Sequence, residues 1–342
     1  MRHTALRQLT LARFREFVRQ PEALFWVFAF PVLLALGLGF AFRERGPERT
    51  PIGVAGPNAA ALAGALGDSP ALRVRIYEGA AGREALRTGR ISLLVEGEGP
   101  PLFRYDPTRP ESRIALLEAD AALQRAAGRR DPLAVERVES TGQGSRYIDF
   151  LIPGLLGLNL MGTGMWSVGF SIATARMQKL LKRLVATPMR KSDYLLSHML
   201  SRLLFLVLEV VVLVGFGWIA FGVAVRGSIA ALAFVSLLGA FTFSAIGLLT
   251  ASRAQTIEGV SGIMNLVMVP MWVASGVFFS VDRFPDAAQP FVRALPLTAL
   301  NDALRAIINE ARPLSSLWLE VAILVAWGVG SFVVALRIFR WK

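Results

Sequence analysis

Two features of the sequence could carry chemistry: a basic amphipathic segment and a carboxylate inside an apolar stretch. The segment at 176–193 has the sequence RMQKLLKRLVATPMRKSD. Its apolar residues follow the i, i+3, i+4, i+7, i+8 spacing of one helical face: Met177, Leu180, Leu181, Leu184 and Val185. The opposite face is basic and a proline ends the helix: Lys179, Lys182, Arg183 and Pro188. Such a helix can be pinned to anionic lipid, or it can dock a partner and transmit its motion, and the pattern favours neither.

The carboxylate is Glu209, which lies within an apolar stretch long enough to reach membrane depth. An ionisable residue at that depth is a candidate functional group because burying a charge in lipid is costly. We expect Glu209 to have a structural or gating role rather than to contact a substrate. Asn265 lies in a later apolar stretch, where it either bonds a neighbouring helix or lines a pathway, and the former is favoured.

Other kinds of chemistry find no support in the sequence. There are no cysteines, and the two histidines, His3 and His198, are far apart. No G-x-x-x-x-G-K-[ST], H-E-x-x-H or G-x-S-x-G motif occurs. We therefore expect no catalytic, cofactor or metal site in this chain and no ATP hydrolysis by it. A membrane enzyme acting on lipid would need a catalytic constellation that is not visible.

The elements that position these residues are predicted by hydropathy. The sequence is 54% hydrophobic and 18% charged, and its apolar residues gather in stretches of about 20 or more, which is the length of a membrane span. We expect a polytopic α-helical membrane protein with six spans, at 22–42, 150–174, 200–224, 228–251, 257–280 and 315–336. Residues 1–21 resemble an amphipathic interfacial helix, mainly at 4–20. The apolar, proline-broken segment 282–312 is expected to be re-entrant at the outer surface.

Residues 43–149 form a nearly neutral insert, with 16 Lys and Arg against 15 Asp and Glu. Their patterning predicts a small α/β domain. Strands are expected at 52–55, 72–77, 91–95 and 102–105, and helices at 59–66, 82–88 and 111–127. The membrane domain then occupies 150–342.

The net charge of +12 gathers in short segments beside the spans. With the N-terminus inside, the inner flanks carry 15 Lys and Arg and the outer flanks carry five. This is the positive-inside distribution, so both termini are expected to be cytoplasmic and the insert extracytoplasmic. Nucleic-acid binding, which basicity alone would suggest, is disfavoured by the same distribution.

Three stretches resemble the permease subunit of type-2 ABC exporters, in the subgroup with a large extracytoplasmic domain after the first span. They are YIDFLIPGLLGLNLMGTGMWSVGF (147–170), KLLKRLVATPMRKSDYLLSHMLSR (179–202) and MVPMWVASGVFFSVDRFPDAAQPFVRALPLTALNDALRA (268–306). The last stretch contains the family's proline in the fifth span, its apolar exit, its Pro-Leu-Thr segment and its Asp-Ala-Leu-Arg: Pro270, Ser275–Phe279, Pro296–Thr298 and Asp302–Arg305. One departure is the acidic, glycine-containing stretch (Glu-Arg-Glu-Arg-Gly-Thr) that usually precedes Leu-Lys-Arg-Leu, because residues 175–180 are Ala-Arg-Met-Gln-Lys-Leu.

The resemblance implies an ATP-driven export permease in a bacterial cytoplasmic (inner) membrane. Two permease chains, as a homodimer or a heterodimer, would form the path in the lipid bilayer. Two separate ATP-binding subunits would hold ATP and Mg and would contact a coupling helix at 176–190, which contains Met177, Lys179, Leu180, Leu181, Lys182, Arg183, Leu184, Val185 and Pro188. Glu209, Asn265 and Pro270 become candidate gating or pathway residues. The scarcity of polar residues in the spans favours a hydrophobic or amphipathic substrate, and the alternative is a non-transporting scaffold or signalling protein whose outer domain binds a partner.

Overall fold

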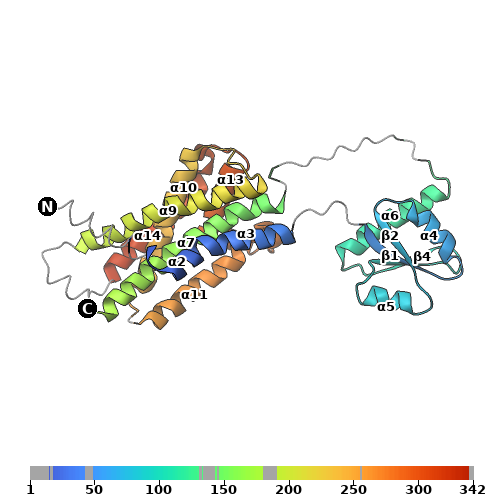
Figure 1. Ribbon diagram of the computed structural model, residues 1–342, viewed down its shortest axis with the longest axis horizontal. Coiled ribbons are helices and arrows are strands. Elements are labelled where there is room, and N and C mark those ends of the chain that lie inside the picture. The colour runs from blue at the N-terminus through green and yellow to red at the C-terminus, as the bar shows by residue number, and fades with distance from the viewer. Residues whose placement is uncertain are drawn as a thin grey trace. The chain divides into compact units, whose positions relative to one another are not determined.

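The computed structural model describes residues 15, 18–42, 49–130, 133, 143, 144, 146–179, 191–254 and 256–338, without the side chains of Ala23 and of 191–204. The chain divides into two compact units, which Figure 1 draws. We call Met1–Arg43 with Ser140–Lys342 the membrane unit and Glu44–Glu139 the insert. Each is described by itself. The amphipathic helix expected at 4–20 lies almost entirely outside the described residues.

The described part of the membrane unit is helical. Its first helix continues from α2 (Pro21–Leu24) through a π-helical turn, η1 (Phe25–Ala29), into α3 (Phe30–Ala41). The long helix α7 (Tyr147–Met177) is central and contacts five other helices. The remaining elements are α9 (Lys191–Phe221), α10 (Ile229–Ala251), α11 (Ile257–Ala274), η2 (Val281–Arg283), α12 (Gln289–Arg293), α13 (Pro296–Ile308), η3 (Leu314–Leu317) and α14 (Trp318–Ile338).

Four of the described helices are long and apolar enough to cross a membrane: α7, α10, α11 and the continuous Leu314–Ile338. Shorter apolar helices occupy Phe25–Ala41 and Phe205–Phe221. The predicted helical membrane protein is therefore confirmed, with four to six apolar helices. The end expected for the fifth span is wrong, since α11 stops at Ala274 rather than near 280. Gly276 has a φ of +67°, a left-handed conformation that ends the helix and that glycine adopts without a steric penalty.

The segment expected to be re-entrant contains η2, α12 and α13. Helix α13 begins with Pro296 at its first turn, a position where proline needs no backbone donor. It packs against α7, α10 and α14, and its apolar residues are fully buried, including Leu297, Leu300 and Leu304. Protein rather than lipid therefore surrounds α13, which is what a short helix with several orphan backbone groups requires.

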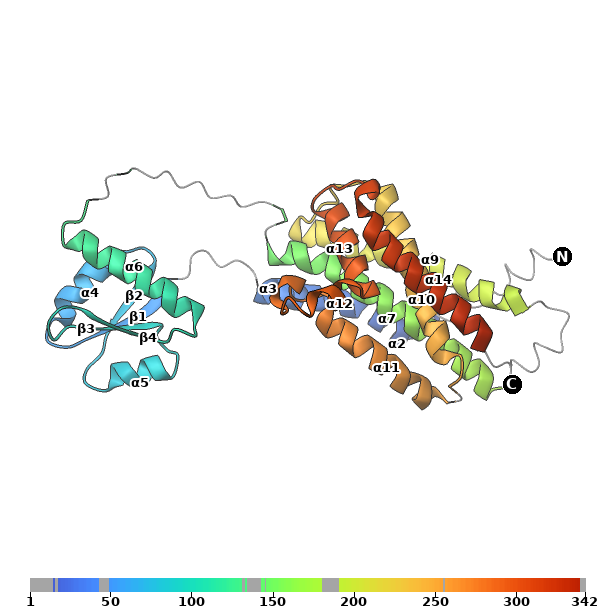
Figure 2. The same cartoon turned by 180° about the vertical axis from the view of Figure 1, so that it is seen from behind.

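The insert is a small α/β domain, as predicted. Its strands are β1 (Thr50–Ala55), β2 (Leu72–Ile76), β3 (Leu93–Glu96) and β4 (Leu102–Tyr105), in the order β2-β1-β3-β4 with only β4 antiparallel. Helices α4 (Ala59–Gly67) and α6 (Pro110–Ala126) cover one face, and α5 (Ala81–Arg87) lies on the other (Figure 2). The unit ends at Glu139, ten residues before the expected boundary at 149, because residues 147–149 already belong to α7.

A charged cluster joins α5, β3 and β4 on the less covered face. The Glu96 carboxylate accepts hydrogen bonds from Arg104 Nε (2.8 Å) and Arg83 Nε (2.9 Å). These two contacts, the Arg104 contact first, hold the pKa of Glu96 below its ordinary value of 4.5. The stabilisation is therefore fully present above pH 4.5 and is lost as the pH falls through the lowered pKa.

The variant Glu96→Gln should loosen this edge of the insert at neutral pH, because it removes the charge from both ion pairs. Hydrogen exchange of residues 93–105 in the full chain, compared with the unaltered protein, should be faster at pH 7, with the difference shrinking as the pH falls through the lowered pKa of Glu96. Glu98→Gln is the matched control, since Glu98 is exposed and makes no described ion pair. A difference between Glu96→Gln and the unaltered chain that persists at low pH would contradict the assignment.

Candidate functional site

The predicted coupling residues begin where α7 ends. Met177 is the last residue of α7, so Arg176 and Met177 belong to this long helix rather than to a separate one. Lys179 follows in a turn and is exposed. The other candidates lie outside the described residues: Leu180, Leu181, Lys182, Arg183, Leu184, Val185 and Pro188.

Lys179 has a φ of +55°, which is uncommon for a residue with a side chain. The left-handed conformation at the residue after a helix cap is usually taken by glycine, and it costs other residues about 1 kcal/mol or more. The glycine of the Glu-Arg-Glu-Arg-Gly-Thr stretch aligns on Lys179 when the two Leu-Lys-Arg-Leu sequences are matched. Lys179 thus adopts a glycine-like conformation at the position of that glycine.

Arg176 connects this end of α7 to the loop between α10 and α11. Its Nη1 donates to the carbonyls of Ala251 (3.1 Å) and Ala254, and its Nη2 donates to that of Ser252 (3.2 Å). Helix α10 has no basic residue in its own last turn, so Arg176 supplies the cation that its C-terminal dipole and orphan carbonyls favour. We call this set of contacts the Arg176 clamp.

The sequence did not reveal the clamp, because its two ends are about 75 residues apart along the chain. A signal was present: α10 ends without a basic or glycine cap, and a single arginine ends α7. The clamp joins the end of α7 to the loop that leads into α11.

Glu209 is buried in α9, where it is 2% exposed. The carboxylate lies 3.2 Å from the Thr163 hydroxyl of α7, which also donates to the Asn159 carbonyl at 2.7 Å. The Asn159 side chain in turn donates to the Val27 carbonyl in the π-helical turn η1, at 3.2 Å. Polar groups therefore connect α9, α7 and the first helix through the apolar interior.

Asn265 and Pro270 lie on α11, whereas Glu209 lies on α9. Both are exposed on α11, beside the exposed apolar residues Leu266 (75%) and Val273 (68%). Pro270 has no N–H and so leaves the Leu266 carbonyl without its helical donor. The exposed side of α11 thus has two polar groups among its apolar side chains, the Asn265 amide and the Leu266 carbonyl. Buried residues of α11 line the opposite side: Val260, Met264, Met268 and Met271.

A second polar cluster holds the start of α7. Asp149 is fully buried and forms a two-point ion pair with Arg146, through Nη2–Oδ1 at 2.6 Å and Nε–Oδ2 at 3.0 Å. Arg146 Nη1 also donates to the carbonyl of Phe221, the last residue of α9. The side chain of Asn309 donates to the Asp149 carbonyl at 2.8 Å. That carbonyl lacks its helical donor because the residue four positions later is Pro153.

Arg305 completes the same end of the membrane unit. Its guanidinium lies 3.6 Å from the centre of the Phe150 ring, and it donates to the carbonyls of Phe150 (3.3 Å) and Gly276. Asp302, one helical turn earlier, lies 3.7 Å away. Arg305 thus joins α13, α7 and the exit from α11. Gly154 permits α7 to lie close to the segment that follows α11, because a Cβ at position 154 would lie 2.6 Å from the Val277 carbonyl oxygen.

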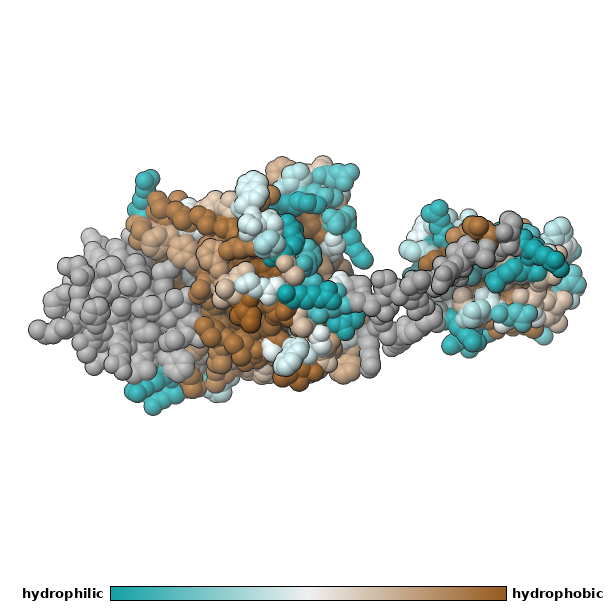
Figure 3. All heavy atoms as spheres, turned by 90° about the horizontal axis from the view of Figure 1, so that it is seen from above, coloured by the Kyte–Doolittle hydropathy of each residue, from teal (hydrophilic) through white to brown (hydrophobic). Residues whose placement is uncertain are grey.

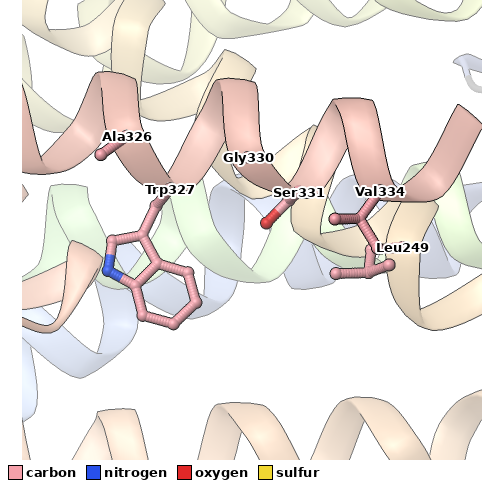
Figure 4. A pocket seen from close by; sticks show the side chains of 6 residues that line it. All are labelled: Leu249, Ala326, Trp327, Gly330, Ser331 and Val334. Atoms are coloured by element: carbon pink, nitrogen blue, oxygen red, sulfur yellow. The ribbon is translucent and has the colours of Figure 1, made fainter.

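The surface of the membrane unit is mostly apolar. Figure 3 shows a broad hydrophobic area on the visible face, bordered by hydrophilic side chains. Between α10 and α14 lies a shallow groove of about 360 Å³, shown in Figure 4 and lined by Leu249, Ala326, Trp327, Gly330, Ser331 and Val334. The Trp327 indole N–H donates to the Ala294 carbonyl at 3.0 Å. Within the described residues, no group of three or more His, Cys, Asp or Glu side chains could hold a metal ion.

Comparison with known proteins identifies the family. Residues 21–337 match the family described as ABC-2 family transporter protein. The chain belongs to this family. Its permeases lack the ATPase domain, so membership implies an ATP-binding partner subunit. The predictions of an ABC transporter permease and of a multi-pass membrane protein are therefore confirmed.

Two relatives illustrate the similarity. ABC transporter G family member 20 of Dictyostelium discoideum is 26% identical over 224 residues, covering 64% of this chain and 30% of that protein. The inner membrane transport permease YadH of Escherichia coli K12 is 25% identical over 165 residues, covering 47% of this chain and 63% of YadH. The alignments thus span less than two thirds of either relative.

The Arg176 clamp leads to a first prediction for the site. Arg176→Gln should speed hydrogen exchange at residues 249–258, because three carbonyls lose a charged donor and each such bond contributes roughly 1.5–3 kcal/mol. The exchange rate in Arg176→Lys should lie between those of the unaltered chain and Arg176→Gln, because one ammonium group cannot reach all three carbonyls. Arg253→Gln, an exposed neighbour, is the control. Unchanged exchange in Arg176→Gln would show that the clamp does not stabilise the loop.

The Asn309 bond leads to a second prediction. Asn309→Leu should lower the stability of the detergent-solubilised chain by about 1–3 kcal/mol, because it leaves the buried Asp149 carbonyl unpaired. Asn265→Leu, at an exposed position, should change the melting temperature little. In a Pro153→Ala background the restored N–H can donate to that carbonyl, so Asn309→Leu should cost less. An equal cost in both backgrounds would exclude the proposed role.

Proposed function

We propose that this chain is the membrane-spanning subunit of an ATP-driven exporter that moves a hydrophobic or amphipathic substrate out of the cytoplasm. Two permease chains form the path, and two ATP-binding subunits drive it from the cytoplasmic side. The chain crosses a bacterial cytoplasmic membrane six times, with both termini inside and the insert outside. Family membership supports the transport role, and the excess of basic residues on one set of flanks supports the orientation.

The exposed face of α11 is the observation that carries this proposal. A helix that faces only lipid gains nothing from an amide and an unpaired carbonyl, because unsatisfied polar groups are costly in hydrocarbon. Asn265 and the Pro270 break lie on this face, as described above. A second chain packed opposite would enclose the Asn265 amide and the unpaired carbonyl in a path that is otherwise apolar. Such a path suits a substrate with a large apolar body and few polar groups.

Coupling follows from the position of the Arg176 clamp. The segment 177–190, on which the ATP-binding subunit would act, leaves α7 directly after Arg176. The clamp then carries its displacement to the α10–α11 loop and so to the helix that lines the path. Glu209, bonded to α7 through Thr163, is the gating candidate on the neighbouring helix. A gate needs two discrete arrangements. The Thr163 hydroxyl has one proton, so it can donate either to the Glu209 carboxylate or to the Asn159 carbonyl.

The variants Leu181→Asp and Leu184→Asp test the coupling face. Each places a carboxylate on the apolar side of the helix, and burying it against a partner costs more than the roughly 1.4 kcal/mol that corresponds to a tenfold loss. We expect about tenfold less ATP-dependent uptake of the amphipathic dye ethidium into inside-out vesicles that contain the ATP-binding subunit. Leu181→Met and Leu184→Met, which keep the face apolar, are the matched controls.

Insertion of each variant is checked by its yield in washed membranes. Normal uptake in both aspartate variants would defeat the coupling assignment. If neither ethidium nor a fluorescent phospholipid moved in the unaltered complex although ATP were hydrolysed, the non-transporting alternative would replace export.

A further inference from the structure

Helix α6 of the insert has two apolar stripes instead of one. The first faces the sheet: its buried residues are the small Ser112, Ala115, Ala119 and Ala122, and the half-buried Leu116 and Leu123 pack against the same core. The second lies on the opposite side, where Ile114 is 57% exposed and Leu117 is 68% exposed. Figure 2 shows α6 lying over the sheet with one side turned away from it. A single stripe is enough to hold a surface helix on its domain, so the second stripe has no partner within the insert.

The second stripe has the spacing of a two-stranded coiled coil. Ile114, Leu117 and Ala121 follow one another at i, i+3 and i+7, the spacing of the a, d and a positions of a heptad. Within parallel coiled coils, a β-branched residue at a with leucine at d favours two strands over three or four. In this register the flanking g positions are Arg113 and Asp120, and the flanking e positions are Glu118 and Arg125.

The flanking charges complement a second copy of the same helix. In a parallel pair each g residue meets the e residue five positions later on the other chain. Arg113 would meet Glu118 of the second copy, and Asp120 would meet Arg125. The symmetry repeats both contacts, so all four are between opposite charges. None of the four residues forms an ion pair within the described part of the chain, and residues five apart on one helix do not face each other.

We propose that α6 is a docking surface for α6 of a second copy of this chain, in a parallel pair about a twofold axis. The proposal rests on the permease dimer proposed above, which supplies the second copy. Two chains inserted with the same orientation in one bilayer are related by an axis along the membrane normal. Two heptads bury too little area for an independent dimer, so the contact forms only where the membrane units hold both inserts at high effective concentration.

Single cysteines test the contact, because the chain has none of its own. Leu117→Cys, at the d position, should form a disulfide with its copy when vesicles containing the full chain are oxidised, since facing d positions lie within disulfide reach. Ala61→Cys, exposed on α4 of the same domain, is the matched control and should cross-link about tenfold less. Equal cross-linking at the two positions would overturn the proposal.

Charge reversal tests the register. Arg113→Glu in the Leu117→Cys chain should reduce cross-linking about fivefold, because two attractive pairs become repulsive. Adding Glu118→Arg should restore it, and this rescue cannot arise within one helix. Rescue by Asp120→Arg instead would indicate antiparallel helices and would overturn the parallel pairing.

Light scattering of the solubilised chain separates this inference from the proposed function. A dimer that fails to cross-link at position 117 would refute the α6 contact and leave the permease dimer standing. A monomer that fails to cross-link would refute the α6 contact together with the homodimer on which it rests, and the transport role would then need a different second permease chain.

Discussion

The membrane unit depends on one constraint: every backbone carbonyl inside an apolar unit needs a donor. The clearest case is the hydrogen bond from the Asn309 side chain to the Asp149 carbonyl, which Pro153 deprives of its helical partner. That bond ties α13 to the start of α7, and the Arg146–Asp149 ion pair adds the end of α9. Pro153 leaves the carbonyl without a helical donor, and α13 supplies the replacement through Asn309.

The same constraint acts at the other end of α7. There the orphan carbonyls belong to α10 and its loop, and Arg176 pairs with three of them. Both ends of the central helix are thus held by side chains that complete the hydrogen bonding of a neighbour. On α11, by contrast, the carbonyl that Pro270 leaves without a donor lies on an exposed face. This difference distinguishes α7, which is built into the core, from α11, whose exposed side would face another chain or a substrate under the proposed function.

Local patterns predicted what local physics determines. The seven elements of the insert fall within about two residues of expectation, because each is short and has its own hydrophobic period. The apolar stretches likewise predicted the long helices. The Asn309 bond and the Arg176 clamp join residues 160 and about 75 positions apart, and no local pattern encodes such a pairing. The available signal was Asp149 four residues before Pro153, because a proline inside a helix leaves the carbonyl four residues earlier without a donor.

Helix α6 illustrates how a weak surface can still have a definite partner. The fully buried residues of its inward stripe are alanine and serine, which let the helix lie close to the sheet, and Leu116 and Leu123 at the edge of the stripe pack against the same core. Its outward stripe carries the larger side chains, Ile114 and Leu117, which a soluble domain acting alone would gain by exchanging for polar ones. Burying Ile114 and Leu117 against a second copy stabilises the pair only when tethering has already reduced the entropy cost of association.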